Sequence, residues 1–230
     1  MKQPVVLSWS GGKDSAMTLH ELRQSTVYEA VSLLTTVAEE FRRISHHGVR
    51  ESLLEEQAKS IGIPVRKVYL PSDQSGGCTN EVYESIMSDV MRDYQRDGVH
   101  LVAFGDLFLD DLRAWREMKL RRAGMEAVFP IWNRNSTELA HQVIALGYKA
   151  MLCCSDERIG VKFAGREYDE HFLRDLPPGV DPCGENGEFH SFVYDGPIFR
   201  HSIPVCVGEI VERDGRYYSD LILNRGGRDF

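Results

Sequence analysis

The chain has 230 residues, of which 42% are hydrophobic, and a net charge of −8. This length accommodates one large domain, or one domain with a small second unit, and the acidic charge argues against a nucleic acid partner. No apolar run is long enough to cross a membrane, and five cysteines are an odd number for a disulfide framework, so we expect a cytoplasmic protein.

The first predicted element is a buried strand at residues 4–7, which a glycine-containing turn connects to a helix at residues 16–22. A turn of this kind points backbone N–H groups and the positive end of a helix dipole at one place, where a phosphate binds. The Lys13 side chain adds a positive charge, and two serines add hydroxyl donors. The sequence therefore predicts a phosphate site at Ser10, Gly11, Gly12, Lys13, Asp14 and Ser15.

Strand and helix patterns then alternate along the chain. Strands are predicted over residues 29–37, 63–70, 99–104, 127–132 and 149–154, and helices over residues 49–60, 79–97, 111–123 and 136–146. This alternation is typical of an α/β fold with a parallel, doubly wound sheet. Because ligands bind at the carboxyl ends of such strands, we expect the glycine turn, Leu34 with Thr35, and Gly105 with Asp106 to share one cleft, with adenine against Leu34 and Thr35.

The pattern changes near residue 155, after which strands and helices no longer alternate. The dipeptide Asp214-Gly215 lies between two runs with strand character, residues 205–211 and 216–223, and predicts a β-hairpin. We therefore expect an ATP-binding domain at residues 1–154 and a small α+β substrate-binding domain at residues 155–230.

A second polar motif occupies residues 180–192. It contains Glu185, Asn186, Glu188 and His190. Two carboxylates three residues apart, beside a histidine and an asparagine, are able to bind a metal, hold an amine, or act as acid and base. A glycine-rich turn leading into a strand explains part of the same composition, so the residues alone leave both interpretations open.

Several motifs together resemble the diphthine–ammonia ligase family of the PP-loop ATPases. They are Ser10-Gly11-Gly12-Lys13-Asp14-Ser15, Gly105-Asp106 with Arg113 and Glu117, Phe129-Pro130-Ile131-Trp132, and Asp181-Pro182-Cys183-Gly184-Glu185-Asn186-Gly187-Glu188-Phe189. The resemblance implies an adenine nucleotide α-hydrolase-like, HUP-type fold with a smaller C-terminal domain. It also implies that ATP, with Mg²⁺, adenylates a carboxylate, and that ammonia or an amine then displaces AMP to give an amide.

The resemblance also suggests roles for single residues. We predict that Lys13 and Arg113 offset charge at the α-phosphate, that Glu185, Glu188 and His190 serve the amine nucleophile, and that Asn186 and Glu117 contact the substrate. Asp14 is predicted to bind the metal, with capping of the helix as the alternative. Family members that act on the translation factor carry glutamate where this chain has His190, so the carboxylate, a small molecule or a modified protein side chain, is not assigned.

Two other functions stay open. Cys78, Cys153, Cys154 and Cys183 make a tRNA-thiolating PP-loop enzyme conceivable, although the chain is acidic and has no Cys-x-x-Cys. A nucleotide-binding sensor without chemistry is the alternative from another class, although a sensor does not need the acidic second motif. We also expect the chain to be able to form a homodimer.

Overall fold

The structure is a computed structural model and describes residues 1–71 and 78–224. Its larger sheet, sheet A, has six strands. They are β1 Gln3–Ser8, β2 Tyr28–Ala38, β3 Arg43–Ile44, β4 Val65–Leu70, β5 Leu101–Ala103 and β6 Glu126–Val128. Five strands run parallel in the spatial order β4–β2–β1–β5–β6, and the short β3 pairs antiparallel with the end of β2.

The strand order of sheet A reverses between β1 and β5. The chain passes from β1 to β2 and β4 on one side, and then places β5 and β6 on the other. Such a reversal opens a crevice at the carboxyl ends of the two strands. The glycine turn follows β1 and Gly105 follows β5, so both lie at this crevice. The prediction of a doubly wound α/β fold is confirmed.

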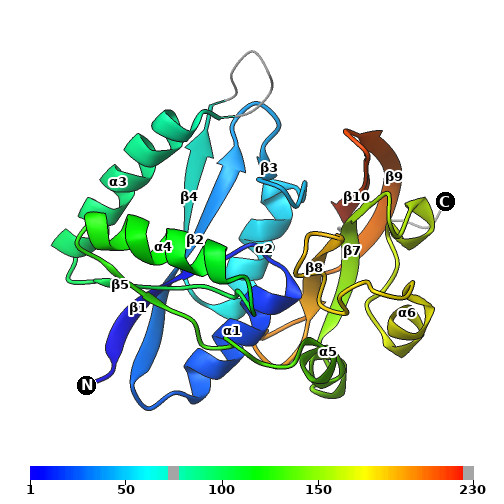
Figure 1. Cartoon of the computed structure of the whole chain (residues 1–230), viewed down its shortest axis with the longest axis horizontal. Helices are drawn as coiled ribbons and strands as arrows, with labels where there is room; N and C mark the ends of the chain where they lie inside the picture. Colours follow the sequence, from blue (N-terminus) through cyan, green and yellow to red (C-terminus); the bar gives the residue numbers. More distant parts are fainter. Residues whose placement is uncertain (72–77, 225–230) are drawn as a thin grey trace.

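Four helices cover the two faces of sheet A (Figure 1). They are α1 Lys13–Gln24 and α2 Glu51–Ile61 on one face, and α3 Asn80–Arg96 and α4 Asp110–Arg122 on the other. The alternation of side chains along β1 explains both layers, because Val5 and Leu7 pack in the core that contains α1 and α2, whereas Val6 packs in the core that contains α3. A strand covered on both faces needs this continuous apolar run.

The ends of the helices follow the local sequence. The Thr79 hydroxyl accepts a hydrogen bond from the Val82 N–H at 3.3 Å and caps α3. Gly62 ends α2 in the left-handed conformation, with φ of 79°. Val90 and Tyr94 of α3 are buried, whereas Val82 near its start is 40% exposed. The C-terminal half of α3 therefore packs in the core.

The C-terminal part of the chain forms a second, antiparallel sheet, sheet B. Its strands are β7 Lys149–Asp156, β8 Phe189–Asp195, β9 Val205–Arg213 and β10 Arg216–Leu223. They lie in the order β8–β7–β10–β9. The accompanying helices are α5 Ser136–Ala145, the 3₁₀-helix η1 Val161–Phe163 and α6 Glu170–Asp175.

The strand predicted at residues 149–154 exists, but its assignment to the parallel sheet was wrong. β7 pairs antiparallel with β8 and β10, so the predicted division between residues 154 and 155 falls inside this strand. An apolar run is compatible with a buried strand in either sheet, so its composition could not identify the sheet. The hairpin prediction is confirmed, because Asp214 and Gly215 connect β9 and β10 with positive φ angles of 51° and 72°.

Helices α1 and α2 lie between the two sheets (Figure 1), and they contact β8 and β10 respectively. Ion pairs strengthen this junction. The Asp220 carboxylate of β10 accepts a bond from Arg43 at 2.9 Å and two from Arg50 at 2.8 and 2.7 Å. Among the helices of the described ranges, none has the length and apolar character needed to cross a membrane.

Candidate active site

The phosphate turn, residues 10–15, begins where β1 ends. The Trp9 N–H donates to the Leu34 carbonyl at 2.8 Å, and the Thr35 hydroxyl donates to the Trp9 carbonyl at 2.6 Å. Gly11 has a φ of 81°, a conformation that favours glycine, and α1 begins at Lys13 without a side-chain cap. The predicted residues Leu34 and Thr35 therefore lie beside the turn, and the N-cap residue of the helix, Gly12, has no side chain to compete with an anion.

Hydroxyl groups surround the backbone of the phosphate turn. The Gly12 N–H donates to Ser10 Oγ at 3.3 Å and the Lys13 N–H donates to Ser191 Oγ at 3.2 Å. Ser10 Oγ and Ser15 Oγ lie 3.4 Å apart, and the Ser15 hydroxyl donates to the Gly12 carbonyl at 2.8 Å. These N–H···O bonds are long, so phosphate oxygens are able to replace the hydroxyl acceptors at small cost.

Gln57 of α2 binds the phosphate turn, and no local sequence pattern marks this residue. Its fully buried amide accepts a bond from Trp9 Nε1 at 3.0 Å, and it donates to the carbonyls of Gly11 at 2.9 Å and Val193 at 2.6 Å. One side chain thus connects the end of β1, the turn and β8. A glutamine inside a helical pattern looks like an ordinary polar position until its partners are known.

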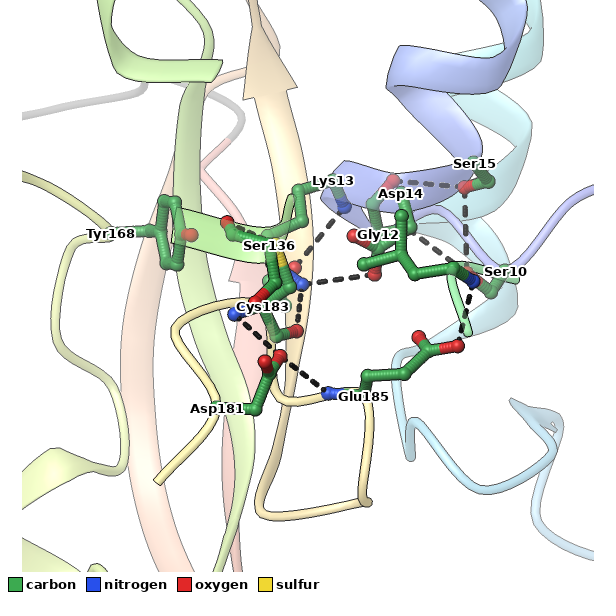
Figure 2. Close-up of polar contacts among 12 residues, drawn as sticks. Ser10, Gly12, Lys13, Asp14, Ser15, Ser136, Tyr168, Asp181, Cys183 and Glu185 are labelled. Carbon is green, nitrogen blue, oxygen red and sulfur yellow. Dashed lines mark hydrogen bonds and ion pairs between the residues drawn. The ribbon is translucent and has the colours of Figure 1, made fainter. Parts of the chain in front are cut away.

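The Lys13 side chain points toward sheet B and is only 2% exposed (Figure 2). Its ammonium donates to the Cys183 carbonyl and to Asp14 Oδ2, the latter at 2.9 Å. It also lies 5.7 Å from the ring centre of Tyr168 and 5.2 Å from that of Phe189. Burial lowers the pKa of Lys13, but the Asp14 charge and other nearby groups outweigh it and leave the pKa above its ordinary value.

Two carboxylates of the crevice lie near Lys13. Asp14 Oδ1 is buried and has no hydrogen-bond partner among the described residues, and burial raises the pKa of this carboxyl although Lys13 opposes the shift. Glu185 Oε1 accepts a bond from the Leu107 N–H at 2.7 Å. Burial, with the charges of Asp14 and Asp106, raises the pKa of Glu185 to about 7. The site therefore holds a carboxyl group that titrates near neutral pH.

Gly105 and Asp106 lie at the same crevice, as predicted. A Cβ atom on Gly105 would approach the backbone carbonyl of Asp14 to 3.0 Å, so only glycine lets β5 come this close to the phosphate turn. Asp106 is held by Arg116 of α4, with bonds of 2.6 and 3.2 Å to its two oxygens. The sequence interpretation missed Arg116, which lies one helical turn beyond the selected Arg113.

Arg113 and Glu117 bind each other rather than the carboxylates of the crevice. Arg113 Nε lies 2.8 Å from Glu117 Oε1, and its guanidinium lies 4.9 Å from the ring centre of Phe129 and 4.7 Å from that of Trp132. Within the described ranges, no hydrogen bond or ion pair joins Arg113 to Lys13 or Glu185. The prediction that both residues serve the reaction stays untested.

The acidic loop, residues 181–188, contains the second motif. Asp181 Oδ1 accepts the N–H groups of Cys183 at 2.9 Å and Glu185 at 3.1 Å, which closes the loop on itself. Glu188 is 1% exposed, and its Oε1 accepts bonds from the Asp181 N–H and the Asn186 amide, both at 3.2 Å. Asp181 and Glu188 therefore shape the loop that presents Cys183 and Glu185 to the phosphate turn.

Replacing Glu188 with alanine is expected to lower the free energy of unfolding by about 1–3 kcal/mol, because the Asp181 N–H loses its buried acceptor. Chemical denaturation of Glu188→Ala measures this change. Exposed Glu157 provides the control, and Glu157→Ala is expected to leave the stability within about 0.5 kcal/mol of the original. Equal stability of the two variants would show that Glu188 does not hold the loop.

His190 lies on β8 and stacks on His47, with ring centres 4.5 Å apart. Burial lowers the pKa of His47 to about 4, and burial with nearby His47, Arg216 and Lys13 lowers the pKa of His190 well below its ordinary value. Both rings are therefore neutral at neutral pH. The sequence did not predict the contact of His47 with β8, because this contact joins distant parts of the chain.

Two family models match the chain. The model of the diphthamide synthase N-terminal domain covers residues 1–127, and that of the diphthamide synthase C-terminal domain covers residues 135–221. The first match alone spans more than half of the sequence.

Curated proteins named diphthine–ammonia ligase are similar over most of the chain. The mouse protein is 24% identical, and the alignment covers 95% of this chain and 89% of the mouse protein. For the zebrafish protein, also 24% identical, these shares are 88% and 86%. The fission yeast protein is 23% identical over 88% of this chain, which amounts to 36% of its own greater length.

A solved structure, described as a predicted subunit of tRNA methyltransferase from Methanocaldococcus jannaschii, aligns over 95% of this chain and 97% of its own. The identity is 15% and the TM-score 0.40. This overlap is too loose to establish a common fold.

Proposed function

The chain belongs to the diphthamide synthase family, and on that premise we propose that it is an ATP-dependent ligase that converts a carboxylate into an amide. One observation carries the proposal: the acidic loop lies against the crevice of sheet A, joined to the phosphate turn by the Lys13 bond to Cys183 and to the segment after β5 by the Leu107 bond to Glu185. A ligase needs this arrangement, because the nucleotide, the carboxylate and the amine must meet at one place.

The proposed reaction has two steps. A carboxylate oxygen of the substrate attacks the α-phosphorus of ATP, the bond to the β-phosphate breaks, and pyrophosphate leaves. Ammonia then attacks the acyl carbon, the bond to AMP breaks, and the nitrogen loses a proton. The names of the relatives favour ammonia as the nitrogen donor.

The phosphate turn binds the triphosphate in this proposal. The dipole of α1, its uncapped first turn, and the hydroxyls of Ser10 and Ser15 favour an anion there. Adenine lies against the end of β2, near Leu34 and Thr35. Asp14 Oδ1 fits Mg²⁺ because it is a buried carboxylate oxygen without a partner in the described chain.

Mg²⁺ would neutralise phosphate charge when bound. No set of three or more candidate metal ligands occurs in residues 1–71 and 78–224, so most ligands would be phosphate oxygens and water. Asp14 is therefore the one protein ligand that we propose.

Glu185 is proposed to accept the proton from the attacking amine. Its pKa of about 7 suits a base at neutral pH, and its location at the crevice supports this role. Glu188 and Asn186 support the loop that carries it. A thiolation reaction has less support, because burial raises the pKa values of the Cys153, Cys154 and Cys183 thiols, whereas sulfur transfer needs a thiolate.

The proposal predicts that ATP yields AMP and pyrophosphate in equal amounts, and that both depend on an acceptor carboxylate. The protein, ATP, Mg²⁺ and ammonium chloride are incubated with a diphthine-bearing translation factor, and separately with a panel of small carboxylic acids. Chromatography of the nucleotides and an enzymatic pyrophosphate assay measure the products.

A variant with Ser10 and Ser15 replaced by alanine is the control and is expected to lose most of the AMP formation. ATP binding without AMP formation with any acceptor would favour the sensor. Formation of ADP and phosphate would contradict the reaction type. Self-association into a homodimer stays a prediction, which the mass of the protein in solution tests.

A further inference from the structure

The ammonium of Lys13 binds sheet B, although its backbone belongs to the phosphate turn. Its acceptors are the Cys183 carbonyl and the neighbouring Asp14 carboxylate (Figure 2), and it lies 5.7 Å from the ring centre of Tyr168 and 5.2 Å from that of Phe189. A side chain that is 2% exposed has exchanged nearly all its water for these partners. A lysine waiting for phosphate would instead keep its ammonium accessible to the nucleotide.

Backbone groups of the phosphate turn also bind sheet B. The Gly11 carbonyl accepts a bond from the Val193 N–H at 2.9 Å, and the Lys13 N–H donates to Ser191 Oγ at 3.2 Å. The phosphate turn is therefore joined to β8 by one main-chain bond and by the Ser191 hydroxyl, and to the acidic loop by the Lys13 side chain.

Resting on the proposed ligase function, we propose that Lys13 is a positioning residue: its ammonium holds the Cys183 carbonyl and so fixes the acidic loop and Glu185 at the crevice. Backbone N–H groups and serine hydroxyls hold the phosphates instead. This role replaces the phosphate contact that the sequence suggests for Lys13. Cys183 is two residues before Glu185, and the Asp181 side chain binds the N–H groups of both, so a displacement of Cys183 moves Glu185 as well.

The charge of Lys13 also acts on Glu185. Burial and the charges of Asp14 and Asp106 raise the pKa of Glu185, and the Lys13 charge opposes them. Removing this positive charge is expected to raise the pKa of Glu185 further. If Lys13 only filled space, its loss would leave the pKa of Glu185 unchanged. The pH dependence of turnover therefore distinguishes a space-filling role from one that depends on the charge of Lys13.

The test is Lys13→Met, which keeps the length of the side chain but removes its charge. Calorimetry is expected to give an ATP dissociation constant within about threefold of the original, while turnover falls by about tenfold or more because the acidic loop is displaced. The acidic limb of the pH–rate profile is expected to move up by about one pH unit. Lys13→Arg keeps the charge and is expected to leave the limb in place.

A second measurement does not depend on turnover. Amide hydrogen exchange of a peptide that covers residues 181–188 is expected to become faster in Lys13→Met, and to stay unchanged in Lys59→Met, because Lys59 is 71% exposed. This result stands even if no acceptor yields AMP, so failure of the ligase proposal and failure of this inference are distinguishable. Loss of ATP affinity by about tenfold or more, or an acidic loop with unchanged exchange, would overturn the inference.

If Lys13→Met does not fold, Tyr168→Phe provides a second test of the same inference. The Tyr168 hydroxyl donates to the Pro182 carbonyl at 2.7 Å, on the other side of the Lys13 ammonium. Removing this one oxygen loosens the same loop without changing the phosphate turn. Turnover is expected to fall while ATP affinity stays the same, and a loss of ATP affinity would count against the inference.

Discussion

Replacing Glu185 with glutamine is expected to slow amide formation by about 100-fold or more, because the amide cannot accept the proton that the attacking ammonia must lose. ATP binding is expected to stay within about threefold, since the glutamine oxygen still accepts the Leu107 N–H. Rapid-quench measurement of the amide and calorimetry of ATP binding test the two halves separately. A Glu185→Gln variant that turns over normally would remove Glu185 from the reaction.

The proposed role of Glu185 as a base also predicts how turnover changes with pH. A base works in its unprotonated form, and the pKa of Glu185 is raised to about 7, so turnover is expected to fall as the pH drops below about 7. In Glu185→Gln this limb is expected to disappear. Glu157→Gln, at an exposed position near the acidic loop, is the control and is expected to keep the original profile. If turnover of Glu185→Gln still falls below about pH 7, the fall is caused by a group other than Glu185.

Replacing Gln57 with leucine is expected to lower the free energy of unfolding by about 2–6 kcal/mol. The change leaves the Trp9 indole N–H and the Val193 carbonyl without their buried partner, and each such group costs about 1–3 kcal/mol. Thermal and denaturant unfolding measure the loss. ATP affinity is expected to fall as well, because Gln57 also holds the carbonyl of Gly11.

Lys59→Leu is the matched control for this prediction, since it places leucine on the exposed side of the same helix. Its stability is expected to stay within about 0.5 kcal/mol of the original. If Gln57→Leu were equally stable, the three hydrogen bonds of Gln57 would not contribute to the fold, and the phosphate turn would owe its conformation to the backbone alone.

Local chemistry made part of this molecule predictable. The strand, glycine turn and helix at the N-terminus, the Thr79 cap, the left-handed Gly62 and the Asp214-Gly215 turn each depend on residues that are neighbours in the chain. The alternation of strands and helices predicted the doubly wound sheet, and the rule that ligands bind at the carboxyl ends of its strands predicted that Gly105 and Asp106 lie at the crevice of the phosphate turn.

The features that the sequence did not predict depend on contacts between residues that are far apart in the chain. Gln57 is 136 residues from Val193, and Lys13 is 170 residues from Cys183. Their roles follow from contacts between sheet A and sheet B, which no local pattern encodes. The same reason hid His47, which stacks on His190 of β8. β7 was assigned to the wrong sheet because its apolar residues fit a buried strand in either sheet.

The bond between the Lys13 N–H and Ser191 Oγ has a consequence for the order in which the chain is synthesised. The strands of sheet A are complete by Val128, whereas the bond joins residues 178 positions apart. A nascent chain that ends before β8 therefore holds its phosphate turn without Ser191, Val193 or the acidic loop. The proposed reaction with ATP therefore needs β8 and the acidic loop, and a chain that ends before β8 is expected to leave ATP unreacted.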